Sequence, residues 1–544
     1  MKLSKDICLG GHYNNKTITG IKLNGYVIYE LWNPFCLILV SSQNYSVPPI
    51  TFQKYNTKTG AYESCKVNIK TTQRDGSYVY EITPAEPGID FVAVPGYASN
   101  RYIQRIESLS GDCRYERIFK NLSSLSFVDA SEWDTSKVTD MSQMFYGCGT
   151  LKSLDLSNFN TSNVTTIDEM FKDCRTLETI NISNWVINLE NIPNTLFVNC
   201  SKLTNIDANN WTLPNAISLE EVFLNTYCER LDTINVSNWN IPNVTSVRSM
   251  FKSFSSLTTV NLSNWNAPSL IDTSYMFNNC PSLINLDFSG WDAPNITNMS
   301  GMFSGMQKLT ELDLSGFDTS NVTDMSWMFN GCSILPQLDL SSFNTSNVIN
   351  MEWMFCNCTR LTTLDLSHFD TSNVTNMGEV FNYCIFLNSL DLSNWKTQNT
   401  TSMEGMFNYC MRLTTLDISN FNTSKVTNMY MMFSDCQALT TLDLSNFDTS
   451  KVTDMGSMFN YCKTLTTLDL RNFDMTNVTY ADSMFYNCNS LTELRLDNCS
   501  NDTINKIITD WSFPTFTSGT HKIYCKEANA SGLTPPEGWT FSYV

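Results

Sequence analysis

Residues 442–462 are "LDLSNFDTSKVTDMGSMFNYC", and close copies of this segment recur along most of the chain. One copy is "LDLSSFNTSNVINMEWMFCNC" at 338–358. We take the Phe near the end of each copy as its marker. Successive markers from Phe145 to Phe485 are 26 residues apart, except for one step of 28 that follows Phe223. A period this strict predicts a solenoid in which each repeat forms one coil.

Each repeat opens with the spacing of a buried strand. Leu151, Leu154, Leu156 and Phe159 follow the pattern L-x-x-L-x-L-x-x-F, the leucine-rich-repeat frame with an aromatic residue where Asn or Cys usually stands. Side chains alternate along a strand, so both Leu side chains of a Leu-Asp-Leu triplet should point inward and Asp155 outward.

A turn and a short helix should complete the coil. The Asp-Thr-Ser-Asn segments carry side chains that bond their own backbone and turn the chain. After the equivalent Asp-Thr-Ser-Lys segment at 134–137, Val138, Met141 and Phe145 have helical spacing, and Thr139 or Asp140 is placed to cap the helix. We therefore expect a leucine-rich-repeat solenoid with one strand and one short helix per coil. Stacking supplies the core that a single repeat lacks.

The repeat resembles the BspA-like leucine-rich repeats, a 26-residue repeat of bacterial surface proteins that is also common in mycoplasma lipoproteins. Residues 442–462 match that pattern closely, and the resemblance covers about three quarters of the chain. It implies a leucine-rich-repeat fold and adhesion at a bacterial surface. Related arrays in phage-encoded proteins extend the expectation to virions.

The regions outside the regular repeats predict a four-part organisation. Extending the 26-residue spacing of the markers in both directions places Phe119 in an additional first coil and Trp511 in an additional last coil. Strand-rich segments precede the array, with Asn24-Gly25 as a hairpin turn. We expect an attachment segment at 1–34, a small β-sandwich-like domain at 35–104, a solenoid of about 16 coils at 105–515, and a capping strand and tail at 516–544. The two extra residues of the long step should form a bulge in "LNTYCER" at 224–230.

Composition narrows the classes of partner. The net charge of −19 and the pI near 4.6 argue against nucleic acid and anionic membranes, because their negative charges would be repelled. The N-terminal "MKLSKDICLGGHYNN" lacks the apolar run of a signal peptide. No stretch approaches the roughly 20 apolar residues of a membrane span. We expect a virion protein, or alternatively a bacterial cell-surface protein exported by another route.

Cysteine placement predicts a buried ladder of free thiols. Among 19 Cys, eleven stand three residues after a marker Phe, and Phe254 and Met306 fill the same position elsewhere. Disulfides between coils are disfavoured because stacked parallel side chains rarely offer the required geometry. The eleven are Cys148, Cys174, Cys200, Cys280, Cys332, Cys358, Cys384, Cys410, Cys436, Cys462 and Cys488.

Catalytic and metal signatures are weak. Cys356 and Cys358 form the closest approach to a metal pair, but no histidine is near them in sequence. His368 replaces the Asn of "LSNF" and should lie exposed at the strand edge. We interpret the "NVT" triplets as turn segments rather than glycosylation sites. Because no catalytic motif stands out from the repeat, we expect a protein that is not an enzyme and uses no cofactor or metal.

The outward Asp side chains of the Leu-Asp-Leu triplets form a predicted binding face on the concave strand side. Neighbouring strands lie about 4.8 Å apart, where like charges repel by roughly 1 kcal/mol in water. A cationic or cation-bridged partner would offset this repulsion, and a solvated, solubilising row is the alternative. Asn181, Asn235 and Asn261 interrupt the row in earlier repeats. The uninterrupted residues are Asp287, Asp313, Asp339, Asp365, Asp391, Asp417, Asp443 and Asp469.

These observations predict a non-enzymatic binding or adhesion protein. The leading interpretation is a phage virion or tail-associated protein that displays the solenoid for attachment to a host protein or glycan. Residues 1–100 would contact other virion or surface-assembly proteins. The alternatives are a bacterial cell-surface BspA-like adhesin and a purely structural virion decoration protein.

Overall fold

The computed structural model describes residues 118–131, 133–223, 228–517 and 521–544, together with the backbone of nine earlier strands. The chain divides into two compact units. The first is Met1–Val244 with Thr259–Asn266, and the second is Thr245–Thr258 with Ala267–Val544.

The strands before the array form a hairpin and two sheets. In one sheet β3 lies between β7 and β9, and in the other β4 lies between β5 and β8. β1 and β2 pair antiparallel, and they flank the predicted Asn24-Gly25 turn, which itself lies outside the described residues. The bounds are β1 Gly20–Leu23, β2 Tyr26–Glu30, β3 Cys36–Ser41, β4 Ile50–Asn56, β5 Ala61–Ser64, β6 Val67–Arg74, β7 Ser77–Pro84, β8 Phe91–Pro95 and β9 Ile103–Ser110. Whether these sheets pack as the sandwich expected at 35–104 stays a prediction.

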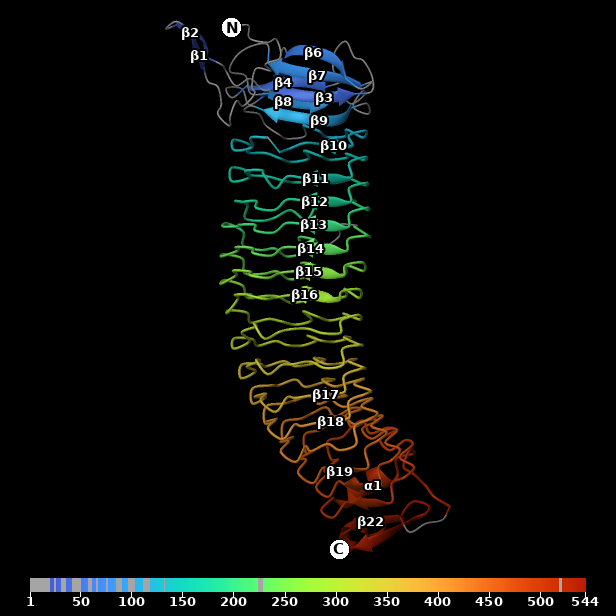
Figure 1. Ribbon diagram of the computed structural model, residues 1–544. Coiled ribbons are helices and arrows are strands. Elements are labelled where there is room, and N and C mark those ends of the chain that lie inside the picture. Colours follow the sequence, from blue (N-terminus) through green and yellow to red (C-terminus); the bar gives the residue numbers. More distant parts are fainter. Residues whose placement is uncertain are drawn as a thin grey trace. The chain divides into compact units, whose positions relative to one another are not determined.

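Both units contain coils whose short strands run parallel, one repeat apart (Figure 1). In the first unit, Leu154 of β11 lies opposite Ile180 of β12. This unit holds β10 Phe127–Val128, β11 Ser153–Asp155, β12 Thr179–Asn181, β13 Asn205–Asp207, β14 Thr233–Asn235 and β15 Thr259–Asn261. The second holds β16 Asn285–Asp287, β17 Thr363–Leu364, β18 Ser389–Leu390, β19 Thr441–Asp443, β20 Thr467–Asp469 and β21 Glu493–Arg495. The solenoid expected from the period is confirmed.

The inner side of each coil is lined by aromatic and aliphatic side chains that stack on their equivalents. Every marker Phe from Phe119 to Phe485 is buried. Phe329 lies between Phe303 and Phe355, with ring centroids 5.7 Å away on each side. A fully buried side chain of this size contributes roughly 1.5–3 kcal/mol, so the core forms only when coils stack.

The segment expected to be a short helix is instead a run of turns bonded to the next coil. The N–H groups of Met141, Gln143 and Phe145 donate to carbonyls 25 residues later, at 2.8–3.0 Å. The intervening Met144 N–H bonds back to Met141 within the coil, and Gln143 has φ 54°. An α-helix is about 10 Å wide, whereas stacked strands lie about 4.8 Å apart. The turns keep the close spacing that a helix would prevent.

The predicted Asp-Thr-Ser-Asn turn is present and also ties the coils together. The Ser320 N–H donates to Oδ1 of Asp318 at 2.9 Å, which closes the turn. Thr319 Oγ1 bonds the backbone of Asn344 in the next coil as donor and acceptor. Asn347 Nδ2 donates to the Ser320 carbonyl at 2.7 Å. The Asn side chain of these segments therefore links neighbouring coils, and the interpretation of the "NVT" triplets as turn segments rather than glycosylation sites stays a prediction.

At the C-terminal end of the array, the last core aromatic residue is not the one that the 26-residue spacing predicted. Trp511 is 69% exposed, and Phe513 packs against the marker Phe485 at 5.4 Å in its place. The helix α1 (Asn501–Ile508) is capped by Ser500, whose Oγ accepts the Thr503 N–H. Its length shifts the last aromatic residue off the 26-residue period. Two strands, not one, then extend the sheet in parallel: β22 His521–Cys525 and β23 Trp539–Tyr543, separated by η2 Glu527–Ala530.

Candidate functional site

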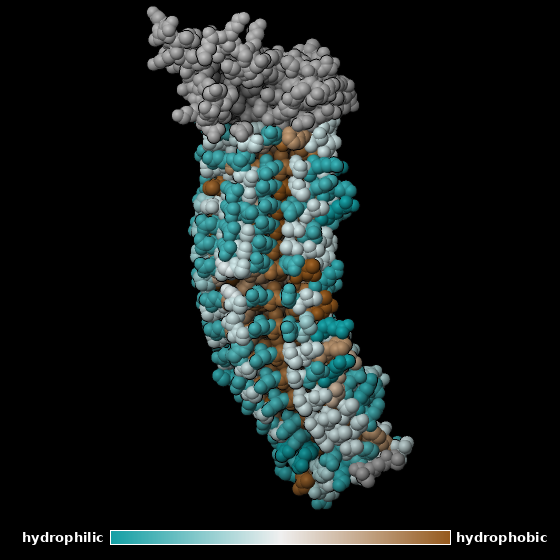
Figure 2. Space-filling model, in the orientation of Figure 1, coloured by the Kyte–Doolittle hydropathy of each residue, from teal (hydrophilic) through white to brown (hydrophobic). Residues whose placement is uncertain are grey.

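The Asp side chains of the predicted acidic face lie at the surface of coils in the second unit. The carboxylates from Asp287 to Asp443 are exposed, and Asp469 is half-buried. The apolar residue that follows each Asp is buried, as Leu366 is after Asp365, and the Leu that precedes each Asp is buried or half-buried, as Leu364 and Leu312 show. Figure 2 shows a largely hydrophilic surface with a narrow hydrophobic stripe crossing the coils. The inward and outward positions were therefore predicted correctly from alternation.

Each carboxylate of the row closes a local turn. Asp365 Oδ1 accepts the backbone N–H of Ser367 at 3.0 Å and its hydroxyl at 2.7 Å. These bonds, the backbone bond first, lower the pKa of Asp365 below its ordinary value. The same bonds from Ser393 lower the pKa of Asp391, although the negative charges of Asp365 and Asp417 act to raise it. Asp365 and Asp391 therefore stay ionised at neutral pH despite the repulsion between them.

Strand pairing beside the Asp positions varies from coil to coil. In the first unit, Asn181, Asn235 and Asn261 separate the acidic residues, and β11–β15 pair without interruption. In the second unit, β17 and β18 end immediately before Asp365 and Asp391. Within the described coils, Asp313, Asp339 and Asp417 belong to no strand. Charge alone does not account for this difference, because Asp443 of β19 lies directly opposite Asp469 of β20 in a paired strand.

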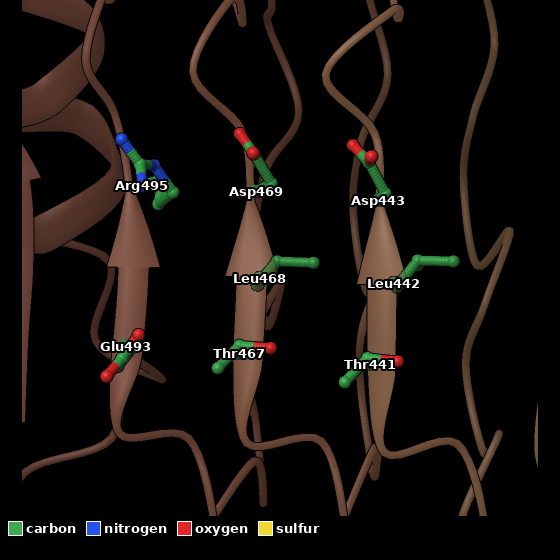
Figure 3. A pocket seen from close by; sticks show the side chains of 8 residues that line it. All are labelled: Thr441, Leu442, Asp443, Thr467, Leu468, Asp469, Glu493 and Arg495. Atoms are coloured by element: carbon green, nitrogen blue, oxygen red, sulfur yellow. The ribbon is translucent and has the colours of Figure 1, made fainter. Parts of the chain in front are cut away.

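A hollow of about 330 Å³ lies at the C-terminal end of the row, on β19, β20 and β21 (Figure 3). Asp443, Asp469 and Arg495 occupy equivalent strand ends, and Thr441, Thr467 and Glu493 line the other end of the same strands. Leu442 and Leu468 lie between the two polar rows. The site offers three carboxylates, two hydroxyls and one guanidinium, a set suited to a cationic side chain.

Two arginines limit the charge at this hollow. Arg471 Nε donates to both carboxylate oxygens of Asp469 at 3.0 Å. Arg495 donates to Asp497 at 2.6 Å and lies 5.4 Å from the ring centroid of Tyr524. Asp443 thus faces the hollow without such a neighbour in its own coil. The C-terminal end of the row is the less acidic end, which the count of Asp residues alone did not reveal.

The cysteine ladder is confirmed as buried free thiols. The Cys332 and Cys358 sulfurs lie 3.3 and 3.2 Å from the carbonyls of Phe303 and Phe329, which are marker residues of the preceding coils. Burial raises the pKa of Cys332 to about 12. All the Cys in the described residues are free and buried. The ladder therefore belongs to the core, and within this part of the chain no three potential metal-binding side chains cluster.

The sequence grid missed one member of the ladder. Cys228 is buried, and its sulfur approaches the Phe197 carbonyl at 3.5 Å, as the other thiols do one coil apart. The two extra residues therefore precede Cys228. The bulge expected at 224–230 stays a prediction, because residues 224–227 lie outside the described residues. Placing the two extra residues of the long step before Cys228 would have identified it from the sequence.

A second class of surface residues also escaped prediction from the sequence. Trp327 and Trp353 stack at 4.6 Å, and Tyr383 and Tyr409 stack at 4.2 Å, all from turns outside the strand face. Phe386 lies beside two arginines of neighbouring coils. The signal was present as aromatic residues at matching positions of adjacent repeats. The strand face is thus not the sole surface with a distinct chemistry.

No helix in the described part of the chain combines the length and the apolar character needed to cross a bilayer.

Comparisons with known proteins place the repeats in a family. Residues 113–233, 226–312, 282–389 and 411–510 match the family model described as "Mycoplasma protein of unknown function, DUF285". No protein with a curated description matches the chain in sequence.

Solved structures similar to the chain are leucine-rich-repeat proteins. One from Leptospira interrogans is 15% identical, with 72% of this chain and 89% of that chain covered and a TM-score of 0.28. One from Bacteroides eggerthii is 18% identical, with 55% and 53% covered and a TM-score of 0.28. The functional domain of InlJ from Listeria monocytogenes, described as including a cysteine ladder, is 14% identical, with 80% and 76% covered and a TM-score of 0.21.

Proposed function

Because the chain belongs to the DUF285 family and folds as a leucine-rich-repeat solenoid, we propose that it is a non-enzymatic binding protein whose acidic strand face receives a basic protein partner. The observation that carries the proposal is the row of carboxylates from Asp287 to Asp443, exposed on successive coils. Solenoid folds of this class generally serve as binding scaffolds.

The chemistry of the row favours a cationic protein surface over an uncharged glycan. The turn bonds hold Asp313, Asp365 and Asp391 ionised, as the lowered pKa of each shows. In Asp365 these bonds use Oδ1, so Oδ2 remains available for a second donor. A basic partner would also relieve the repulsion between neighbouring carboxylates. Many weak, equally spaced contacts give such a surface avidity without a deep pocket.

The proposal also concerns where the protein displays its solenoid. We expect the chain on a phage virion or tail, with residues 1–100 attaching the array to the assembly. A bacterial cell surface is the alternative. Mass spectrometry of purified virions and of washed cells carrying the encoding genome separates the two: detection in virions supports the first, and detection in the cell-wall fraction alone contradicts it.

A binding experiment with the intact chain tests the acidic face. The probe is a fluorescent twelve-residue peptide alternating Lys and Thr, titrated at low and at physiological salt. Asp365→Asn, Asp391→Asn and Asp417→Asn together should raise the Kd about 10-fold and flatten its salt dependence, because three adjacent charges are removed.

The matched control removes three exposed carboxylates outside the row: Asp502→Asn, Glu527→Gln and Glu537→Gln. It has the same net charge as the triple variant, so it should retain most of the affinity. Equal losses in both variants would reduce the row to a part of the general negative charge and contradict the proposal.

A further inference from the structure

Three successive coils of the second unit place two arginines on one phenylalanine. Arg360, Phe386 and Arg412 occupy the same position, five residues after their markers. The guanidinium carbons lie 5.1 Å and 4.2 Å from the Phe386 ring centroid. Because the arginines come from the preceding and the following coil, they lie on opposite faces of the ring. Stacking of this kind holds a guanidinium in place and leaves its N–H edge free to donate.

These two arginines lack the acidic partners that others in this unit have. Arg471 and Arg495 pair with Asp469 and Asp497, each two residues away in sequence. Within the described residues, Arg360 and Arg412 form no ion pair, although the chain carries a net charge of −19. Two fixed cations without a carboxylate in an acidic protein form an open site for an anionic group.

The surroundings of the arginines are apolar. Ile334, at the same position one coil before Arg360, is 40% exposed. Ile385 and Met411, each adjacent in sequence to a member of the stack, are half-buried. Arginine, methionine and aromatic residues are enriched where proteins contact each other, and arginine and large aromatic residues dominate the binding energy there. This combination favours a protein partner over a purely ionic ligand.

We propose that Arg360, Phe386 and Arg412 form a clamp for an acidic protein segment. The two guanidinium carbons lie no more than about 9 Å apart across the ring. Carboxylates three residues apart on a polyproline II segment are separated by about 9 Å on one side of that helix. Each guanidinium would donate two parallel N–H bonds to one carboxylate. An extended acidic segment running across the coils therefore fits the clamp.

The clamp does not depend on the acidic row, although the same coils carry Asp365, Asp391 and Asp417 five residues later. A partner that uses both would present carboxylates beside basic side chains. The clamp is tested with an acidic probe and the row with a basic one, so the two proposals fail separately. The triple Asn variant of the row should keep its affinity for the acidic probe.

Fluorescence anisotropy with labelled (Glu-Pro-Pro)5, titrated with the intact chain at physiological salt, tests the clamp. Arg360→Glu with Arg412→Glu should raise the Kd at least about 10-fold, since attraction becomes repulsion. Arg230→Glu with Arg248→Glu is the matched control, because both are exposed arginines outside the stack and the charge change is equal. The control should change the Kd less than about 2-fold.

Two further measurements separate the role of the ring from that of the charges and identify the class of occupant. Phe386→Leu keeps the apolar contact but removes the ring, so it should raise the Kd about 3-fold with both charges present. Circular dichroism melts confirm that each variant folds. Equal losses in the two arginine pairs, or no loss in the clamp pair, would overturn the proposal. So would clamp-dependent binding to heparin or to phosphatidylserine vesicles that exceeds binding to the peptide, since the occupant would then be a sulfated glycan or a membrane.

Discussion

Single residues in this protein are defined by the coil position they occupy. His368 stands where other repeats have Asn, and it is exposed as expected. Its Nε2 nevertheless lies 2.9 Å from the Leu340 carbonyl of the preceding coil. Asn158 makes the equivalent bond, donating to the Ala130 carbonyl at 2.7 Å. The histidine thus replaces the amide in the same contact between coils, which its exposure alone would not indicate.

The first prediction compares that contact with the core. Phe329→Ala should lower the free energy of unfolding by about 3–5 kcal/mol, because it leaves a cavity in a ring stack. His368→Ala should cost about 0.5–1 kcal/mol by removing one hydrogen bond, and His368→Asn should restore most of it. Urea unfolding of the three variants measures these values. Equal costs for Phe329→Ala and His368→Ala would contradict the assigned inward and outward positions.

Glu379 is the residue with an unusual protonation. Burial, then the charge of Glu404, raises its pKa to about 7, although Asn382 donates to it and opposes the shift. Between its ordinary value of 4.5 and about 7, only the folded state holds the proton. The contribution of Glu379 to the free energy of unfolding therefore falls as pH rises through this window, and it stays low above the window.

The second prediction follows from this sign. Glu379→Gln should stabilise the chain by about 1–2 kcal/mol at pH 8, a value reduced from the full shift because the side chain is only half-buried. At pH 4 the variant and the parent should be equally stable. Thermal melts across this range are the measurement, with the exposed Glu527→Gln as a control. A benefit that does not change with pH would contradict the assigned pKa.

Stacked coils also match large side chains with glycine at the same position of the next coil. Gly301 has φ +59°, and a Cβ there would lie 2.5 Å from the ring of Tyr275. The same position holds Glu169 and Trp353 at φ 51° and 61° in other coils. Positive φ alone therefore does not require glycine, and the ring above Gly301 does.

The third prediction tests this match. Gly301→Ala should destabilise the chain by about 1–3 kcal/mol, since overpacking forces the ring or the backbone to move. Gly149→Ala meets nothing closer than 3.9 Å and should stay within about 0.5 kcal/mol. Chemical denaturation of both variants provides the comparison. A neutral Gly301→Ala would mean that Tyr275 moves aside without cost.

The ladder of thiols supplies the fourth prediction. Fifteen of the 19 Cys lie in the described residues, and all of these are buried. Thiol titration of the folded chain without denaturant should therefore label no more than about 4 of the 19 Cys, and denaturation should make the rest reactive. Labelling of a dozen thiols in the folded chain would show that the coils open readily or that the ladder is wrong.

At the scale of elements, the strand, the turn and the buried rows could be predicted from sequence. The run of turns that stands in place of the expected short helix could not. Met141 and Met144 are three residues apart, a spacing that both a helix and a series of three-residue turns produce. The distinguishing bonds join residues 25 apart, such as Met141 to Thr166. The arginine stack on Phe386 escaped for the same reason, since its members are one repeat apart and differ in type.

At the scale of the whole molecule, the acidic row could be located from sequence, but its consequences could not. Alternation sufficed to place Asp365 and Asp391 outward. The strands β17 and β18 end immediately before these two residues, which no periodicity reveals. Likewise, the hollow at Asp443 depends on Arg495 two coils later. Function in a repeat protein is set by differences between repeats, and these appear only when the coils are stacked.

The bonds between coils recur at constant sequence separations, and this has a consequence for how such a gene can change length. The Cys410 and Cys436 sulfurs approach Phe carbonyls of the preceding coil, 29 residues earlier in both cases. Excision of residues 391–416 would bring equivalent partners together again at the new junction. Unequal recombination between repeats can therefore lengthen or shorten the array by whole coils. Each such event also resets which charges face one another, so new binding surfaces can arise without any substitution.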